Sequence, residues 1–488
     1  MARPAQHDDK QDYKEPEVIV GTVDVEYEEE QAPLDVDEEY LSAPKGIKFY
    51  RSVLFQMILF GALSFVGPAM QDAINNLGGG GLSSPYLANL ATALSYVMST
   101  LMTFVGGPII NKIGIKWACM VAAVFMPLGG AGYYVRARYK IDSFLLAARA
   151  IGGFTNGFLY VGETAAMMSY PDMNERGRYL GIWSAMRNSG SVVGGAINFV
   201  TNHKDSGHGG IAWSTYLIFI GFECTGVVWA GLLSQTRKVR RSNGVRVPAS
   251  ENVSWLKEFR ALGKHLMSKR VWLMTIPAMY SFFYGGVCGT YLSLNFSVRS
   301  RALSSLIMPS VTIVMVVTYG LVLDNHRLSQ KKRAWIAFLA WAVPQSAAFI
   351  WMAVNDNNYW KNGHPALDYT LSRSEWAKGY FPYLIIFSTG YWCQLSIYWI
   401  LGTFSTDVKS ASRTGGLFRS AETIGQAISY GINSRQTASG RNIPLYVNIA
   451  LLVITMPCMI GLIRLVPLKP KNHDDVAEGV VEPVKVVE

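Results

Sequence analysis

The sequence predicts an all-α integral membrane fold with twelve transmembrane helices in two six-helix halves. Composition is the first reason, because 50% of the 488 residues are hydrophobic and only 16% are charged. The second reason is the pattern. A helix needs about 20 mainly apolar residues to cross ~30 Å of hydrocarbon, and twelve such runs occur. The third is the longest polar interval, 234–270, which separates six runs from six.

These runs are expected to be helices because lipid offers an exposed backbone no hydrogen-bond partner. The short segments of alternating polarity that a β-barrel needs do not occur in the sequence. The fifth and eleventh runs are the least apolar, since they carry Arg187 and the pair Arg419 and Glu422. In chain order the runs cover residues 50–70, 87–107, 117–135, 143–169, 178–200, 211–233, 271–293, 302–323, 334–354, 380–403, 415–433 and 443–465.

The distribution of Lys and Arg predicts the orientation, because cytoplasmic loops carry an excess of both. With the N-terminus inside, the inner segments hold 25 of these residues and the outer loops hold 11. We therefore expect a multi-pass protein with both termini cytoplasmic. The sequence does not distinguish the plasma membrane from an endomembrane.

The charge pattern also predicts the domain organisation. Residues 1–44 hold 14 acidic and 3 basic side chains, whereas 45–467 hold 15 acidic and 38 basic ones. Bases between apolar runs favour contact with the lipid bilayer and exclude nucleic acid as a partner. The expected parts are a disordered acidic cytoplasmic tail at 1–44, a first six-helix bundle at 45–233, a basic cytoplasmic linker at 234–270, a second six-helix bundle at 271–466 and a cytoplasmic tail at 467–488. Within the linker, residues 254–268 are expected to form a short helix along the membrane surface.

Two similar corners follow the second and eighth runs. Each reads as Gly, three apolar residues, Asn or Asp, and then basic residues. Transporters built from two repeated bundles show this kind of duplication. The corners therefore predict an inner gate made by Gly107, Asn111, Lys112, Gly114 and Lys116 in the first half and by Gly320 and Asp324 in the second.

These corners resemble the major facilitator superfamily, whose inner loop reads G-x-x-x-D-[RK]-x-G; Asn111 stands where the family has Asp. The stretch Arg149-Ala-Ile-Gly152-Gly153 resembles the family's fourth-span pattern, with Gly152 in place of Gln. The resemblance implies two bundles around a central cavity and a role for Arg149 in coupling protons or solute.

A closer resemblance is to the Unc-93-like branch, particularly its fungal members. It rests on Gly78-Gly-Gly-Gly81, Met168-Ser-Tyr-Pro171 and Gly177-Arg-Tyr179, together with the first corner. Some animal members of this branch regulate other membrane proteins, which implies a second kind of function.

Ionisable residues inside apolar runs are costly and by default face the bundle interior. In the fourth run Arg149, Asn156 and Glu163 are seven residues apart, so they share one stripe of a helix. Arg419 and Glu422 are three apart and are expected to neutralise each other. The transport or coupling candidates are Arg149, Asn156, Glu163, Glu223, Arg419 and Glu422. The alternative is that they are buried pairs that hold helices together.

Other features exclude further classes of function. Arg187 lies near the inner end of its run and is expected to snorkel toward water. All five cysteines fall inside apolar runs without a CxxC pair, so neither a disulfide framework nor a metal site is predicted. We expect no cofactor and no enzymatic activity, because the sequence has no nucleophile elbow and no paired carboxylates.

The sequence therefore predicts a secondary transporter that moves an unidentified small organic solute by alternating access. Proton coupling and efflux of a metabolite are extensions of this hypothesis. The alternative is a non-transporting regulatory or trafficking protein that binds a protein partner.

Overall fold

The computed structural model describes residues 37–75, 85–172, 175–202, 213–247, 254–325, 327–404, 408–434 and 443–467. Most of both predicted tails and the Gly78 to Gly81 stretch lie outside these ranges. Apart from isolated bridges, the regular elements in the described ranges are helices. These are α1 Glu38–Ser42, α2 Lys45–Arg51, α3 Val53–Val66, α4 Pro68–Asn75, α5 Pro85–Ile113, α6 Ile115–Phe125, α7 Pro127–Tyr139, α8 Asp142–Ser169, α9 Arg176–Asn202, α10 Trp213–Cys224, α11 Gly226–Leu232, a 3-10 turn at Thr236–Lys238, α12 Trp255–Leu266, α13 Lys269–Ser281, α14 Tyr284–Asn295, α15 Val298–Leu323, α16 Gln330–Asn362, α17 Arg373–Gly402, α18 Val408–Ile432 and α19 Ile443–Arg464.

Ten segments in the described ranges are long and apolar enough to cross a bilayer. Four of them consist of two helices in series: α3 with α4, α6 with α7, α10 with α11 and α13 with α14. Helices α9 and α18, with 27 and 25 residues, are long enough but more polar. They correspond to the fifth and eleventh predicted runs, which are the least apolar of the twelve. By length and composition, ten of the twelve predicted spans are therefore supported.

The first span extends further than the sequence predicts. The predicted run ends at residue 70, but the span continues from Val53 to Asn75. Helix α3 ends at Val66 with Gly67 as its C-cap, and Pro68 opens α4 because proline lacks a backbone N–H yet fits the first turn of a helix. The extension places Gln71 and Asp72 inside the bundle, where both contribute to the site described below.

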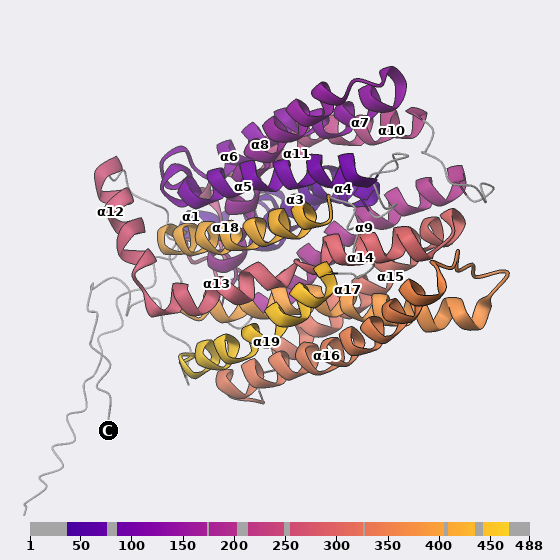
Figure 1. Ribbon diagram of the computed structural model, residues 1–488. Helices are drawn as coiled ribbons and strands as arrows, with labels where there is room; N and C mark the ends of the chain where they lie inside the picture. Colours follow the sequence, from indigo (N-terminus) through magenta and orange to yellow (C-terminus); the bar gives the residue numbers. More distant parts are fainter. Residues whose placement is uncertain are drawn as a thin grey trace, which may run out of the picture. The chain divides into compact units, whose positions relative to one another are not determined.

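Two long helix pairs join the helices before the linker (α2 to α11, the first helix set) to those after it (α13 to α19, the second helix set). Helix α5 packs along α18, and α9 packs along α15 (Figure 1). Glycines permit the close approach. A Cβ on Gly107 would lie 2.7 Å from the Cα of Arg413, and a Cβ on Gly195 would lie 2.1 Å from the carbonyl oxygen of Ser305.

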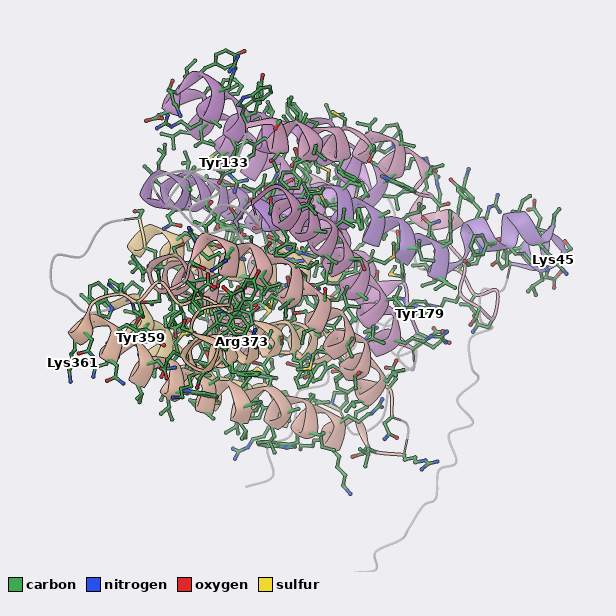
Figure 2. All side chains as sticks on the ribbon, turned by 90° about the vertical axis from the view of Figure 1, so that its right-hand side faces the viewer. Lys45, Tyr133, Tyr179, Tyr359, Lys361 and Arg373 are labelled. Atoms are coloured by element: carbon green, nitrogen blue, oxygen red, sulfur yellow. The ribbon has the colours of Figure 1, made fainter. Side chains whose placement is uncertain are left out.

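Helix α12 lies at one end of the bundle and contacts α5, α13 and α18 (Figure 1). We call this end the linker end. The helix confirms the prediction of a short helix at 254–268. Figure 2 shows Lys45 and Tyr179 on the opposite side of the view from Tyr359 and Lys361.

The packing of α9 against α15 generates a prediction about stability. Gly195→Ala should lower the thermal unfolding midpoint of the purified protein, at a cost of about 1–3 kcal/mol, because a methyl group there overlaps the Ser305 carbonyl. Gly221→Ala is the matched control, since a Cβ at Gly221 meets no atom within 4 Å. Equal midpoints for the two variants would contradict the close approach of α9 and α15.

Candidate functional site

Helix α8 carries the predicted stripe of Arg149, Asn156 and Glu163. All three side chains are buried, with exposed fractions of 4%, 4% and 0%. A buried ionisable group needs a partner inside the protein. The structure gives the two ends of the stripe different surroundings.

At one end, Arg149 contacts groups from two other helices. Its Nη1 donates a hydrogen bond to Oε1 of Gln71 in α4 at 2.7 Å, and its guanidinium lies 5.8 Å from the centre of the Tyr133 ring of α7. Another predicted candidate, Glu223 of α10, interacts electrostatically with Arg149. Its Oε2 accepts a hydrogen bond from the backbone N–H of Gly130 at 3.2 Å. The structure therefore brings two candidates from different runs into one cluster.

At the other end of the stripe, Glu163 lies against α3. Its Oε1 accepts a hydrogen bond from the Ser64 hydroxyl at 2.6 Å. Arg419 and Arg187 interact with it electrostatically. The structure therefore places this end of the stripe between α3 and charged groups of α9 and α18.

Asp72 and Arg187 form an ion pair that the sequence analysis did not predict. The Nη2 of Arg187 lies 2.9 Å from Oδ2 of Asp72. The expectation that Arg187 snorkels is wrong, because the side chain is only 10% exposed and binds helix α4. Asp72 was missed because the predicted first run ended two residues before it. A scan that allowed the helix to continue past Pro68 would have found it.

Tyrosines from both helix sets surround this ion pair. The charge of Asp72 acts on four of them, namely Tyr96 of α5, Tyr160 of α8, Tyr391 of α17 and Tyr430 of α18. The rings of Tyr96 and Tyr430 stack with their centres 5.8 Å apart. Asp72 keeps 24% of its side chain exposed. Tyrosines of both helix sets therefore lie near this pair, in which Arg187 is buried and Asp72 is partly exposed.

The predicted pair of Arg419 and Glu422 is confirmed. Their closest nitrogen and oxygen atoms are 2.6 Å apart, and both side chains are 2% exposed. Gln394 of α17 donates a second hydrogen bond to Glu422 at 2.9 Å. Glu422 is thus held within the second helix set.

Arg419 also reaches across to the first helix set. Its Nε donates a hydrogen bond to Oγ1 of Thr164 in α8 at 3.1 Å. Its guanidinium lies 5.0 Å from the centre of the Tyr160 ring and 5.4 Å from that of Tyr398. Such cation–π contacts strengthen when water is excluded.

The first predicted corner lies at the linker end. Asn111 donates hydrogen bonds to Oε2 of Glu258 in α12 at 3.1 Å and to the carbonyl of Lys409 in α18 at 3.4 Å. Lys112 lies over the Trp255 ring, and Lys116 donates to the carbonyl of Gly231 at 2.8 Å. Gly114 has a positive φ of 84°, which favours glycine.

The second corner makes the corresponding contact. Oδ1 and Oδ2 of Asp324 accept hydrogen bonds from the backbone N–H groups of Gly177 and Arg178 at 2.8 and 2.5 Å. A carboxylate is favourable at the N-terminus of a helix such as α9. Gly320 permits the approach, because a Cβ there would lie 2.6 Å from the carbonyl oxygen of Gly177. In each corner the polar residue therefore binds the start of a helix from the other set.

Glu258 fastens the linker to the second helix set. Its carboxylate lies 3.1 Å from Nε of Arg413. Burial by itself raises the pKa of Glu258, but hydrogen bonds from Arg413 and Asn111 outweigh burial and hold the pKa below its ordinary value. The carboxylate is therefore charged, and it links α5, α12 and α18.

The fold is that of known membrane transport proteins. The Escherichia coli fucose:proton symporter FucP has a TM-score of 0.58 at 11% identity, with 86% of this chain and 100% of that chain covered. A D-xylose–proton symporter has a TM-score of 0.56 at 12% identity, with 85% and 97% covered. Residues 52–430 match the Major Facilitator Superfamily, and the chain belongs to this family.

Sequence relatives confirm the resemblance to the Unc-93-like branch. UNC93-like protein 1 of Arabidopsis thaliana is 26% identical over 89% of this chain and 94% of its own length. The "Notoamide biosynthesis cluster protein O'" of Aspergillus versicolor is 31% identical over 80% of this chain and 84% of its own length. An UNC93-like protein of Schizosaccharomyces pombe is 27% identical over 83% and 82%.

The ion pair between α4 and α9 generates a prediction about coupling. Asp72→Asn and Arg187→Gln should each destabilise the purified protein by about 1–3 kcal/mol, because each leaves a buried or partly buried charged group without its hydrogen-bonded partner. The double variant should cost less than the sum of the two by about 1 kcal/mol or more. Denaturant unfolding of all four proteins measures this, and additive costs would show that the pair is not coupled.

The Glu258 contact generates a prediction about pH. Because its pKa is lower in the folded protein, the contact stabilises α12 above the ordinary pKa of about 4.3 and is lost as the pH falls through the lower folded value. Hydrogen exchange of the α12 amides, corrected for the intrinsic rate, should therefore lose protection below about pH 4. Glu258→Gln should show reduced protection at neutral pH without that acid step. If Glu258→Gln still loses protection of the α12 amides at acid pH, another group must be responsible for that loss.

Proposed function

We propose that the chain is a secondary transporter that moves a small organic solute by alternating access between its two helix sets. In this proposal α9 and α18 cross the membrane as well, which gives twelve spans in two six-helix bundles with the linker end facing the cytoplasm. The excess of Lys and Arg in the inner segments supports this orientation.

The observation that carries the proposal is the paired charge at the contact between the helix sets. Arg419 belongs to one set and binds Thr164 and Tyr160 of the other. Asp72 and Arg187 lie within reach of tyrosines from both sets. In a protein with one fixed conformation, apolar side chains at this contact would often stabilise the fold as well as buried ion pairs do. A protein that must separate the two sets and rejoin them can use contacts that exchange partners.

The two corners support a gate at the linker end. Asp324 and Asn111 each bind the start of a helix from the opposite set, so both contacts must break before this end opens. The linker adds a third contact through Glu258 and Arg413. The corners act as latches in this proposal.

Proton coupling is part of the proposal, with Glu163 as the acidic group. Glu163 is fully buried, and its Oε1 is bound by Ser64. Arg419 acts on it from the second helix set. Separation of the sets would remove that positive charge and favour uptake of a proton by Glu163.

Efflux of a metabolite is the direction we propose. The name of the Aspergillus versicolor relative connects that protein with a biosynthesis cluster. A transporter of this kind would export the product of such a cluster.

The test is a comparison of small molecules inside and outside cells that carry the intact chain, lack it, or carry Glu163→Gln at equal membrane abundance. The expected result is that one compound is retained, to the same extent, both without the chain and with the variant. Gly221→Ala is the matched control and should behave as the intact chain does.

The alternative function is regulation of another membrane protein, which the Unc-93-like names leave open. The same experiment separates the two. If no compound is redistributed, transport fails, and a protein partner becomes the better hypothesis. The candidate surfaces for such a partner are the loop 355–379 and the acidic tail at 1–44.

A further inference from the structure

We propose that helix α12 docks on a lipid surface with negatively charged headgroups, and that this contact stabilises α12 against the end of the bundle. The proposal goes beyond transport, because it concerns a partner of the linker and involves no solute. Three features of the described residues carry it: the place of α12 beside the ends of membrane spans, an exposed basic face next to an exposed apolar one, and a third face bound to both helix sets.

Helix α12 lies where membrane spans end. It ends at Leu266, and the span that contains α13 begins three residues later, at Lys269. The other end of α12 meets the end of the α5 span, because Nζ of Lys112 lies 5.7 Å from the centre of the Trp255 ring. Both ends of α12 are therefore tied to the ends of spans, which places the helix at the level of a bilayer surface.

One exposed face of α12 is basic. Lys257, Arg260 and Lys264 follow each other at intervals of three and four residues, so they lie on one side of the helix. All three are exposed, and none of them forms a hydrogen bond or an ion pair with another residue that the structure describes. The acidic residue of the helix, Glu258, is buried and paired with Arg413. The exposed face therefore carries a positive charge that attracts anionic headgroups.

Two other basic residues of the linker are already bound by the protein. Arg240 is buried and forms an ion pair with Asp37. Arg241 is buried as well, and its Nε lies 3.0 Å from Oδ1 of Asp172. Neither guanidinium is available to a headgroup, so α12 is the part of the linker that is suited to bind lipid.

The adjacent exposed face of α12 is apolar, which favours a lipid surface over a nucleic acid or an acidic protein. The rings of Trp255 and Phe259 stack with their centres 6.3 Å apart, and both are exposed. Leu256 is 67% exposed, and Met267, directly after the helix, is 85% exposed. Aromatic and aliphatic side chains beside basic ones suit the boundary between headgroups and acyl chains.

The third face of α12 joins the two helix sets. The carboxylate of Glu258 accepts hydrogen bonds from Asn111 of α5 and from Arg413 of α18, both at 3.1 Å. A lipid surface that binds the exposed faces would keep Glu258 beside these partners. Lipid binding and the contact at the linker end would therefore stabilise each other.

Amide hydrogen exchange of the full chain in lipid nanodiscs tests the proposal. Discs of phosphatidylcholine alone are compared with discs that also contain phosphatidylserine. The α12 amides should exchange about tenfold or more slowly in the anionic discs, because each exposed Lys or Arg is attracted to the negative surface. Phosphatidylglycerol should act as phosphatidylserine does, since it carries the same charge, and high salt should weaken both effects.

A variant with Lys257→Gln, Arg260→Gln and Lys264→Gln in one chain should lose this lipid effect, so that its α12 amides exchange at the same rate in both kinds of disc. The matched control removes the same charge near the start of α16 and should keep the lipid effect. Its substitutions are Arg327→Gln, Lys331→Gln and Lys332→Gln.

Three outcomes would overturn the proposal. The first is equal exchange of the α12 amides of the intact chain in neutral and anionic discs, which would leave a protein partner as the better occupant. The second is a lipid effect that the α12 variant retains, or faster exchange of that variant in neutral discs as well, because its bases would then bind the protein. The third is an effect of phosphatidylserine that phosphatidylglycerol does not reproduce, which would indicate recognition of one headgroup.

Discussion

Charge inside a bundle that faces lipid must be neutralised by the protein itself, and this constraint organises the molecule. Little water reaches the interior of such a bundle, so a buried charge requires a partner on its own helix or on a neighbouring one. Helix α9 is stable in the bundle because Arg187 meets Asp72 of α4. Helix α18 is stable there because Arg419 and Glu422 neutralise each other within one turn.

The same requirement ties the two helix sets together. The four helices that join the sets, α5, α9, α15 and α18, combine glycines with polar groups, and their close approach brings hydrogen-bonding atoms from both sets within reach. At the linker end this gives the reciprocal contacts of Asp324 and Asn111. Nearer the middle it gives the contact of Arg419 with Thr164. These contacts hold the two helix sets in the arrangement that the structure shows.

Much of the fold could be predicted because apolar runs of span length have one structural solution in lipid. The predicted stripe on α8 proved to be one buried face, and the local pair of Arg419 and Glu422 was recognisable from its spacing alone. The prediction failed at Arg187 and omitted Asp72, because their contact joins residues 115 positions apart. Spacing along one helix carries no information about such a contact.

The sequence by itself predicted a helical membrane protein, since hydrophobic length and helical period are local properties. Its corner motifs carried the resemblance to the major facilitator superfamily. It also determined which residues are too polar to face lipid. Only the tertiary structure decided which of them pair. It paired Arg187 and Arg419 with carboxylates and placed Gln71, Tyr133 and Glu223 around Arg149. It also left no room for a side chain at Gly153. These outcomes depend on how helices distant in the chain pack against each other.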